Sequence, residues 1–153
     1  MSQITNDEEF RQALHGLDAV QQRVVAAGFV EHVLSLSTDD RIAGIVKVAA
    51  DSGASDNDVA NALKSAKSAA IDSHTRCGSE GDWTDQAGYF VARAAVAAVT
   101  PLAQSKGGSP AWQAAMSCRM AKTSILIDNE ADEAPSHNES EWQYSMLSDY
   151  LNS

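Results

Sequence analysis

Residues 24–36 read VVAAGFVEHVLSL, an apolar run that is interrupted only by Gly28, Glu31, His32 and Ser35. A helix with apolar side chains on every side is typical of the centre of a bundle, because a surface helix keeps one polar face. Asp18 lies upstream of this run and can cap the helix. The stretch therefore predicts a central helix over residues 18–36, around which the other elements pack.

The composition indicates that those other elements are helices as well. Of the 153 residues 26 are Ala, whereas only 3 are Pro and 9 are aromatic. Alanine is the best helix former, and strands prefer β-branched and aromatic residues. With 44% apolar and 21% charged residues, the chain is expected to fold. We predict an all-α fold in which a single domain, residues 1–153, forms a compact bundle of about six to seven helices.

Apolar residues spaced by three and four, between capping residues and Gly or Pro stops, place the remaining helices. They are expected over about 6–16, 39–52, 55–76, 83–100, 110–128 and 139–151. The intervening residues 129–138 are polar and acidic and contain Pro135, which predicts a mobile linker. The last helix is expected to dock on the bundle, because its apolar residues share one face. These residues are Trp142, Met146, Leu147 and Tyr150.

Acidic residues are concentrated at the C-terminus. The chain carries 21 acidic and 11 basic residues, and its net charge is −10. Residues 1–127 hold 14 acidic and 11 basic residues, whereas 128–153 hold 7 acidic and none basic. This balance disfavours nucleic acid as a partner, since a phosphate backbone needs clustered Lys and Arg. The acidic segment is either a solubilising face or a surface for a basic protein partner. The candidate contacts are Asp128, Glu130, Asp132, Glu133, Glu139 and Glu141.

The sequence also indicates a location. The first residues, MSQITNDEE, have neither the basic nor the apolar region of a signal peptide, and no apolar run reaches 18 residues without a charge. We therefore expect a cytoplasmic protein with no membrane contact. Cys77 and Cys118 lie in separate predicted helices, and both are expected to be free thiols.

Glu31 and His32 are the most informative polar residues, because they interrupt the apolar run of the central helix. A buried ionisable group must be paired or hydrogen-bonded. Arg41, at the start of the next helix, and Arg93 and Arg119, in otherwise apolar helices, are candidate partners. The first interpretation is a buried polar network of Glu31, His32 and Arg41 that fixes how the helices pack.

A second interpretation assigns chemistry to the same pair. His74 and Cys77 are three residues apart, a spacing that can bring two metal ligands together on one helix. A metal site or an enzyme inside the bundle would use Glu31 and His32 with His74 and Cys77. No second ligand pair of familiar spacing follows, and no cofactor motif is found, so we expect no cofactor and no catalytic residues.

One further pattern resembles a known family. The stretch AAGFVEHVL at residues 26–34 is followed by Asp39-Asp40-Arg41, which opens an Ala-rich helix, and a late helix contains Glu141-Trp142-Gln143 with Leu147 and Leu151. This order over residues 22–151 resembles the all-helical immunity proteins of bacterial polymorphic toxin systems (Imm-five-like). The resemblance implies a small cytosolic protein that neutralises a cognate toxin by binding it, without turnover. Only Glu31, His32 and Arg41 carry over from the family pattern.

Three hypotheses for function follow. The first is a non-enzymatic binding protein that masks a toxin through an acidic surface. The second is a helical-bundle metal protein or enzyme that uses the Glu-His pair. The third is a structural or regulatory helical subunit in which this pair only sets the packing.

Overall fold

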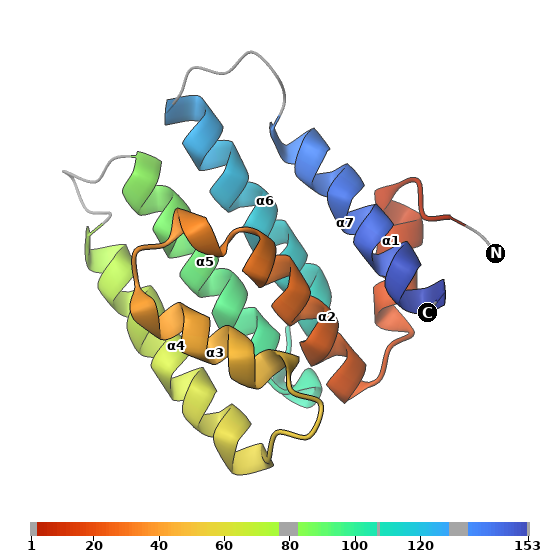
Figure 1. Ribbon diagram of the computed structural model, residues 1–153, viewed down its shortest axis with the longest axis horizontal. Coiled ribbons are helices and arrows are strands. Elements are labelled where there is room, and N and C mark those ends of the chain that lie inside the picture. Colours follow the sequence, from red (N-terminus) through yellow and green to blue (C-terminus); the bar gives the residue numbers. More distant parts are fainter. Residues whose placement is uncertain (1–2, 77–82, 107, 129–134, 153) are drawn as a thin grey trace.

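The computed structural model describes residues 3–76, 83–106, 108–128 and 135–152. Within these residues the chain forms seven α-helices and two short 3-10 helices, and no strand (Figure 1). The prediction of an all-α bundle is confirmed. The helices are α1 (Asp7–His15), α2 (Ala19–His32), α3 (Asp40–Ala50), α4 (Asp56–Arg76), α5 (Trp83–Val99), α6 (Pro110–Asp128) and α7 (Pro135–Asn152), with 3-10 helices η1 (Leu34–Leu36) and η2 (Leu102–Gln104).

Helix α2 is central, as its apolar run predicts. It packs against α3, α5 and α6 and also contacts α7. Its residues Val25, Ala26, Ala27, Phe29 and Val30 are at most 1% exposed. The helix is shorter than the predicted 18–36, because Val33 leaves the helical conformation with φ −110° and ψ 9° and the chain continues as η1. The last predicted turn therefore becomes the connection that turns the chain back toward α3.

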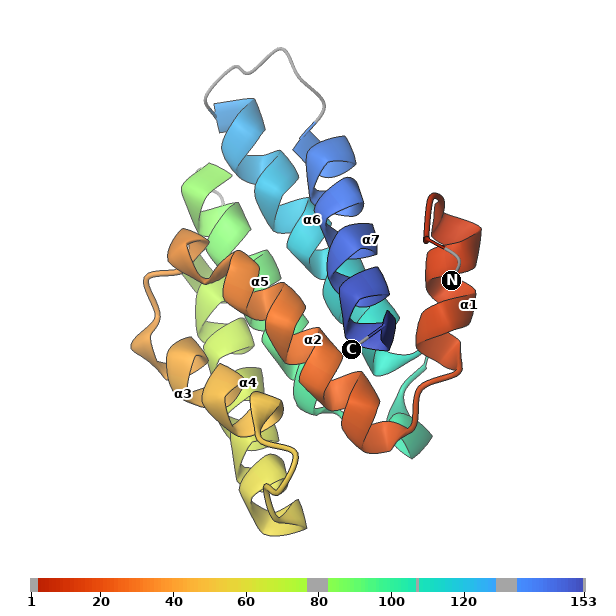
Figure 2. The ribbon, with the colours of Figure 1, turned by 45° about the vertical axis from the view of Figure 1, so that its right-hand side comes forward.

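The other helices are arranged in a layer with α2 and α3 over it. Helices α4, α5 and α6 lie side by side, and α7 follows beside α6 (Figure 1). Helix α1 lies beyond α7, at the edge of the bundle (Figure 2). Alanine lines the contacts between the helices of the layer, and its small side chain lets helix axes approach closely. The fully buried alanines of this layer include Ala66, Ala69, Ala94, Ala114 and Ala115.

Helix starts follow local capping rules. Asn6 caps α1 by accepting a hydrogen bond from the amide of Glu9, whereas Thr5 bonds the Glu9 carboxylate through its own amide and hydroxyl. Asp18 and Gln21 form a reciprocal capping box at the start of α2. Such pairs satisfy amide donors that have no partner inside the helix.

The predicted C-terminal boundaries need a correction. Helix α7 begins at Pro135 instead of 139, so the linker that we predicted over 129–138 is too long. Proline fits the first position of a helix because an amide at that position has no acceptor within the helix, so the absence of the N–H group costs no hydrogen bond. Residues 129–134 lie outside the described residues. Within the described part of the chain, no helix combines the length and the apolar character that a membrane crossing requires.

Candidate functional site

The predicted buried network of Glu31, His32 and Arg41 does not form. Glu31 is exposed, and 33% of the His32 side chain is exposed. Both residues belong to the last turn of α2, directly before Val33 and η1. The apolar residues before and after Glu31 and His32 suggested that this pair is buried as well. Those apolar side chains are buried, but they lie on other faces of the helix than Glu31 and His32. The correction is that this pair lies at the end of the central helix and not inside the core.

His32 instead contacts the C-terminal helix. Its Nδ1 lies 2.9 Å from Oε2 of Glu139, whose side chain is only 2% exposed. Its ring stacks on Trp142, with ring centroids 3.5 Å apart and planes at 5°. Glu139 was predicted to be a surface contact for a partner, and its burial against His32 removes it from that surface. Through Glu139 and Trp142, His32 joins the end of α2 to the first half of α7.

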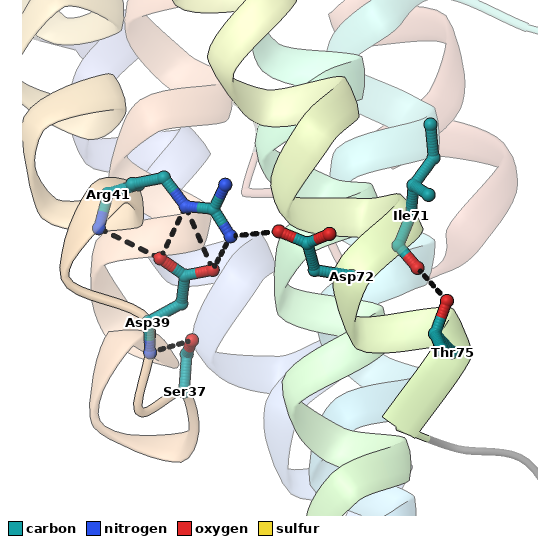
Figure 3. A network of polar contacts seen from close by, with 6 residues as sticks. All are labelled: Ser37, Asp39, Arg41, Ile71, Asp72 and Thr75. Carbon is teal, nitrogen blue, oxygen red and sulfur yellow. Dashed lines mark hydrogen bonds and ion pairs between the residues drawn. The ribbon is translucent and has the colours of Figure 1, made fainter.

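Arg41 forms a separate network on the surface (Figure 3). Its guanidinium donates to both carboxylate oxygens of Asp39, with Nη2 2.7 Å from Oδ2, and to Asp72 at 2.8 Å. Both carboxylates raise the pKa of Arg41. Asp39 also caps α3, and Asp72 lies on α4. The network therefore links the start of α3 to α4 and does not include Glu31 or His32.

The residues of the metal alternative are distributed over two helices. His74 is exposed on α4 and packs its ring 5.4 Å from Tyr89, whereas His32 is at the end of α2. Cys77 lies outside the described residues. Among the residues that the structure does describe, no three His, Cys, Asp or Glu side chains are grouped as a metal site would require. Cys118 is a free thiol with no exposed area, and burial and the nearby Glu139 raise its pKa.

A network that the sequence did not suggest joins α1, α6 and α7. Arg119, 8% exposed, donates from Nε to Gln143 Oε1 at 2.8 Å and from Nη1 to Asp7 Oδ2 at 3.1 Å. Gln143 is fully buried and donates to the carbonyl of Ala115 at 3.0 Å. Tyr144 donates to Asp7 Oδ1 at 2.6 Å. The buried guanidinium thus holds the first residue of α1 against the middle of α7.

This network changes the acidity of two of its members. The hydrogen bonds from Arg119 and Tyr144 and the positive charge of Arg119 hold the pKa of Asp7 below its ordinary value of 3.8. Burial and the neighbouring Asp7 carboxylate raise the pKa of Tyr144. At neutral pH the carboxylate of Asp7 is therefore ionised and the Tyr144 hydroxyl keeps its proton.

An open groove of about 780 Å³ lies between the N-terminal segment and α7 above this network. The charged residues of its lining are Asp7, Glu141 and Arg119, and the polar residues are Gln3, Thr5, Asn6, Ser140, Tyr144 and Ser145. The amide of Ile4 donates to the Ser148 hydroxyl at 3.2 Å, which fixes the N-terminal segment along α7. Glu8 and Glu9 are exposed in the first turn of α1. We refer to Asp7, Glu8, Glu9 and Glu141 as the acidic edge.

The acidic edge agrees only in part with the surface predicted from the sequence. Glu141 is exposed, as a partner contact must be. The side chain of Asp128 and the residues Glu130, Asp132 and Glu133 lie outside the part of the chain that the structure describes. The acidic start of α1 was not among the predicted partner contacts. The acidic residues near both termini are visible in the sequence, but no short-range pattern indicates that the two termini lie side by side.

No protein-family model matches the chain, and no match is found among curated proteins or among solved structures. The resemblance to immunity proteins and the expectation of a toxin partner stay predictions.

Proposed function

We propose that this protein is a non-enzymatic binding protein whose acidic edge contacts a basic protein partner. The observation that carries the proposal is the docking of the acidic first turn of α1 on the acidic helix α7, through Asp7, Arg119 and Tyr144. Charges from both ends of the chain form one surface there. Arg119 also lines the groove, but it is only 8% exposed and is paired with Asp7, so the exposed charge of the acidic edge comes from Glu8, Glu9 and Glu141.

Charge of this kind favours fast, selective encounter with a partner of opposite charge. The groove beside the edge offers hydroxyl and amide groups, which can pair with the Lys and Arg side chains of a partner. The resemblance to immunity proteins motivates a cognate bacterial toxin as that partner and the cytoplasm as the place where the two meet. A toxin that acts on nucleic acid has a basic active face, and carboxylates can occupy positions where substrate phosphates would bind.

The test is a quantitative affinity capture from cells of the source organism with three tagged baits. These are the wild type, an edge variant with Glu8→Gln and Glu141→Gln, and a control with Asp56→Asn and Asp58→Asn at the exposed start of α4. The two variants lose the same charge at different ends of the bundle. We expect a basic protein to be retained by the wild type and the control and to be reduced at least ten-fold with the edge variant.

The association rate of the purified partner should then fall steeply between about 50 and 300 mM salt, since screening weakens steering between exposed charges. A partner that the edge variant retains as well as the wild type does would refute the acidic edge as the contact surface. Recovery of no stoichiometric partner by any bait would refute the binding function itself.

A further inference from the structure

A second groove lies on the layer of α4, α5 and α6 and has the opposite charge. Its volume is about 540 Å³, and every residue that lines it belongs to these helices or to Thr100, directly after α5. Helices α2 and α3 lie over one face of this layer (Figures 1 and 2), and neither contributes to the lining. Its walls are half-buried or exposed apolar side chains, including Ile71 of α4 and Trp112 and Met116 of α6.

The floor of the groove has helical dimensions. Tyr89, Arg93, Val96 and Thr100 follow one another at spacings of four, three and four, so they form a single stripe along α5. The eleven steps from Tyr89 to Thr100, at about 1.5 Å each, give the stripe a length of about 16 Å, or about three turns. Residues half a turn away, such as Val91 and Ala98, are at most 2% exposed. The outer face of α5, between α4 and α6, is therefore a straight channel open to solvent.

Two large exposed apolar residues lie on the helices that form the walls of the channel. Met120 follows Met116 by four residues on α6 and is 48% exposed, and Ile71 on the α4 wall is 66% exposed. These two belong to the five large apolar side chains that are exposed among the described residues. Ile71 lines the channel, and exposed apolar surface beside a groove is typical of a contact surface.

The charge of the channel selects its occupant. Lys67 and Arg93 are the charged residues of its lining, and no Asp or Glu is found among the described residues that form it. Both cations are exposed, and the guanidinium of Arg93 lies 5.8 Å from the centre of the Tyr89 ring. In a chain of net charge −10 such a surface opposes a basic partner and favours an acidic one. A symmetric dimer through this face would bring the same cations of two copies together.

We propose that this channel is a docking site for an amphipathic helix of another protein, about three turns long, whose apolar stripe is flanked by carboxylates. The apolar stripe lies along Val96, Met116 and Ile71, and the carboxylates pair with Lys67 and Arg93. Helix-in-groove recognition uses the same arrangement, in which apolar anchors at helical spacing enter a hydrophobic groove. The site is separate from the acidic edge, and it does not depend on the function proposed for that edge.

A peptide selection tests this proposal. The probe is a displayed library of 18-residue helical peptides with randomised apolar and flanking positions, selected on the full-length protein. Selected peptides are then measured by fluorescence anisotropy against the wild type, a channel variant with Lys67→Glu and Arg93→Glu, and a control with Lys47→Glu and Lys122→Glu. Lys47 is exposed and Lys122 is half-buried, and neither lines the channel, so the control makes the same change of net charge elsewhere.

We expect the enriched peptides to carry Glu and Asp beside an apolar stripe and to bind the channel variant at least ten-fold more weakly than the wild type and the control. Backbone amide shifts in ¹⁵N-labelled protein should change along α4, α5 and α6. Enrichment of basic or uncharged peptides would overturn the proposal, as would equal binding to both variants. Concentration-dependent self-association that the channel variant abolishes would also overturn it, because a second copy would then cover the channel.

Discussion

Replacing Gln143 by Met tests how α7 is held to the bundle. The amide of Gln143 is fully buried, accepts a hydrogen bond from the Arg119 guanidinium and donates one to the carbonyl of Ala115. Methionine has a similar length and can fill the same space. The substitution therefore removes two hydrogen bonds and leaves the packing largely unchanged.

The expected cost follows from the burial of Arg119. A hydrogen bond to a charged group contributes about 1.5–3 kcal/mol, and a buried donor that loses its acceptor keeps the desolvation penalty. We expect Gln143→Met to lower the free energy of unfolding by about 2–3 kcal/mol. With a typical urea slope of about 2 kcal/mol per molar, the unfolding midpoint should fall by about 1–1.5 M. The measurement is urea unfolding followed by circular dichroism at pH 7.

Two further variants make the interpretation specific. Gln12→Met replaces an exposed glutamine of α1 and should change stability by less than about 0.5 kcal/mol. In a double-mutant cycle, Arg119→Met and Gln143→Met together should cost less than the sum of the single changes by about 1–2 kcal/mol. A loss below about 0.5 kcal/mol for Gln143→Met, or strictly additive effects, would refute the role of this contact in holding α7.

Further measurements address α1 and two glycines. Phe10 has no exposed area and packs among aromatic rings of α2, α6 and α7, so Phe10→Ala should cost about 3–5 kcal/mol in urea unfolding, and a cost near zero would contradict the docking of α1. The folded protein lowers the pKa of Asp7. The ionised Asp7 carboxylate therefore contributes to the free energy of unfolding above pH 3.8, and this contribution is lost as the pH falls through the pKa of Asp7 in the folded state. The difference in stability between the wild type and Asp7→Asn should therefore be largest near pH 7 and vanish toward pH 2, whereas a gap that persists there would exclude linkage to this carboxyl. Gly108→Ala should destabilise by about 1–3 kcal/mol, since φ is +127° and a β-carbon would lie 2.8 Å from Trp112 Cδ1. Gly44→Ala, in an open part of α3, should stabilise the protein by about 0.5–1 kcal/mol. Thermal unfolding measures both glycine variants, and a change of the same sign in the two midpoints would contradict this pair of predictions.

Local sequence patterns were sufficient to predict the helices and the central position of α2. Capping residues, glycines and prolines act within a few residues of their position, so helix ends such as Trp83 and Pro110 could be predicted closely. The apolar run of α2 likewise required burial of its apolar side chains, wherever their neighbours came from. The predicted start of α7 was wrong because Pro135 both ends a preceding segment and suits a helix start, and only the rest of the chain distinguishes the two.

Tertiary structure decided which polar residues are buried and which of them meet. His32 and Glu139 are 107 residues apart, and Arg119 joins an aspartate 112 residues before it to a glutamine 24 residues after it. Such pairs depend on which helix faces come together, and spacing along one helix carries no information about the partner helix. Glu31 shows the opposite case, because the nearby Val30 and Val33 are buried while Glu31 itself is exposed. The acidic edge and the cationic channel both arise in this way, from residues whose common surface exists only after the helices have packed.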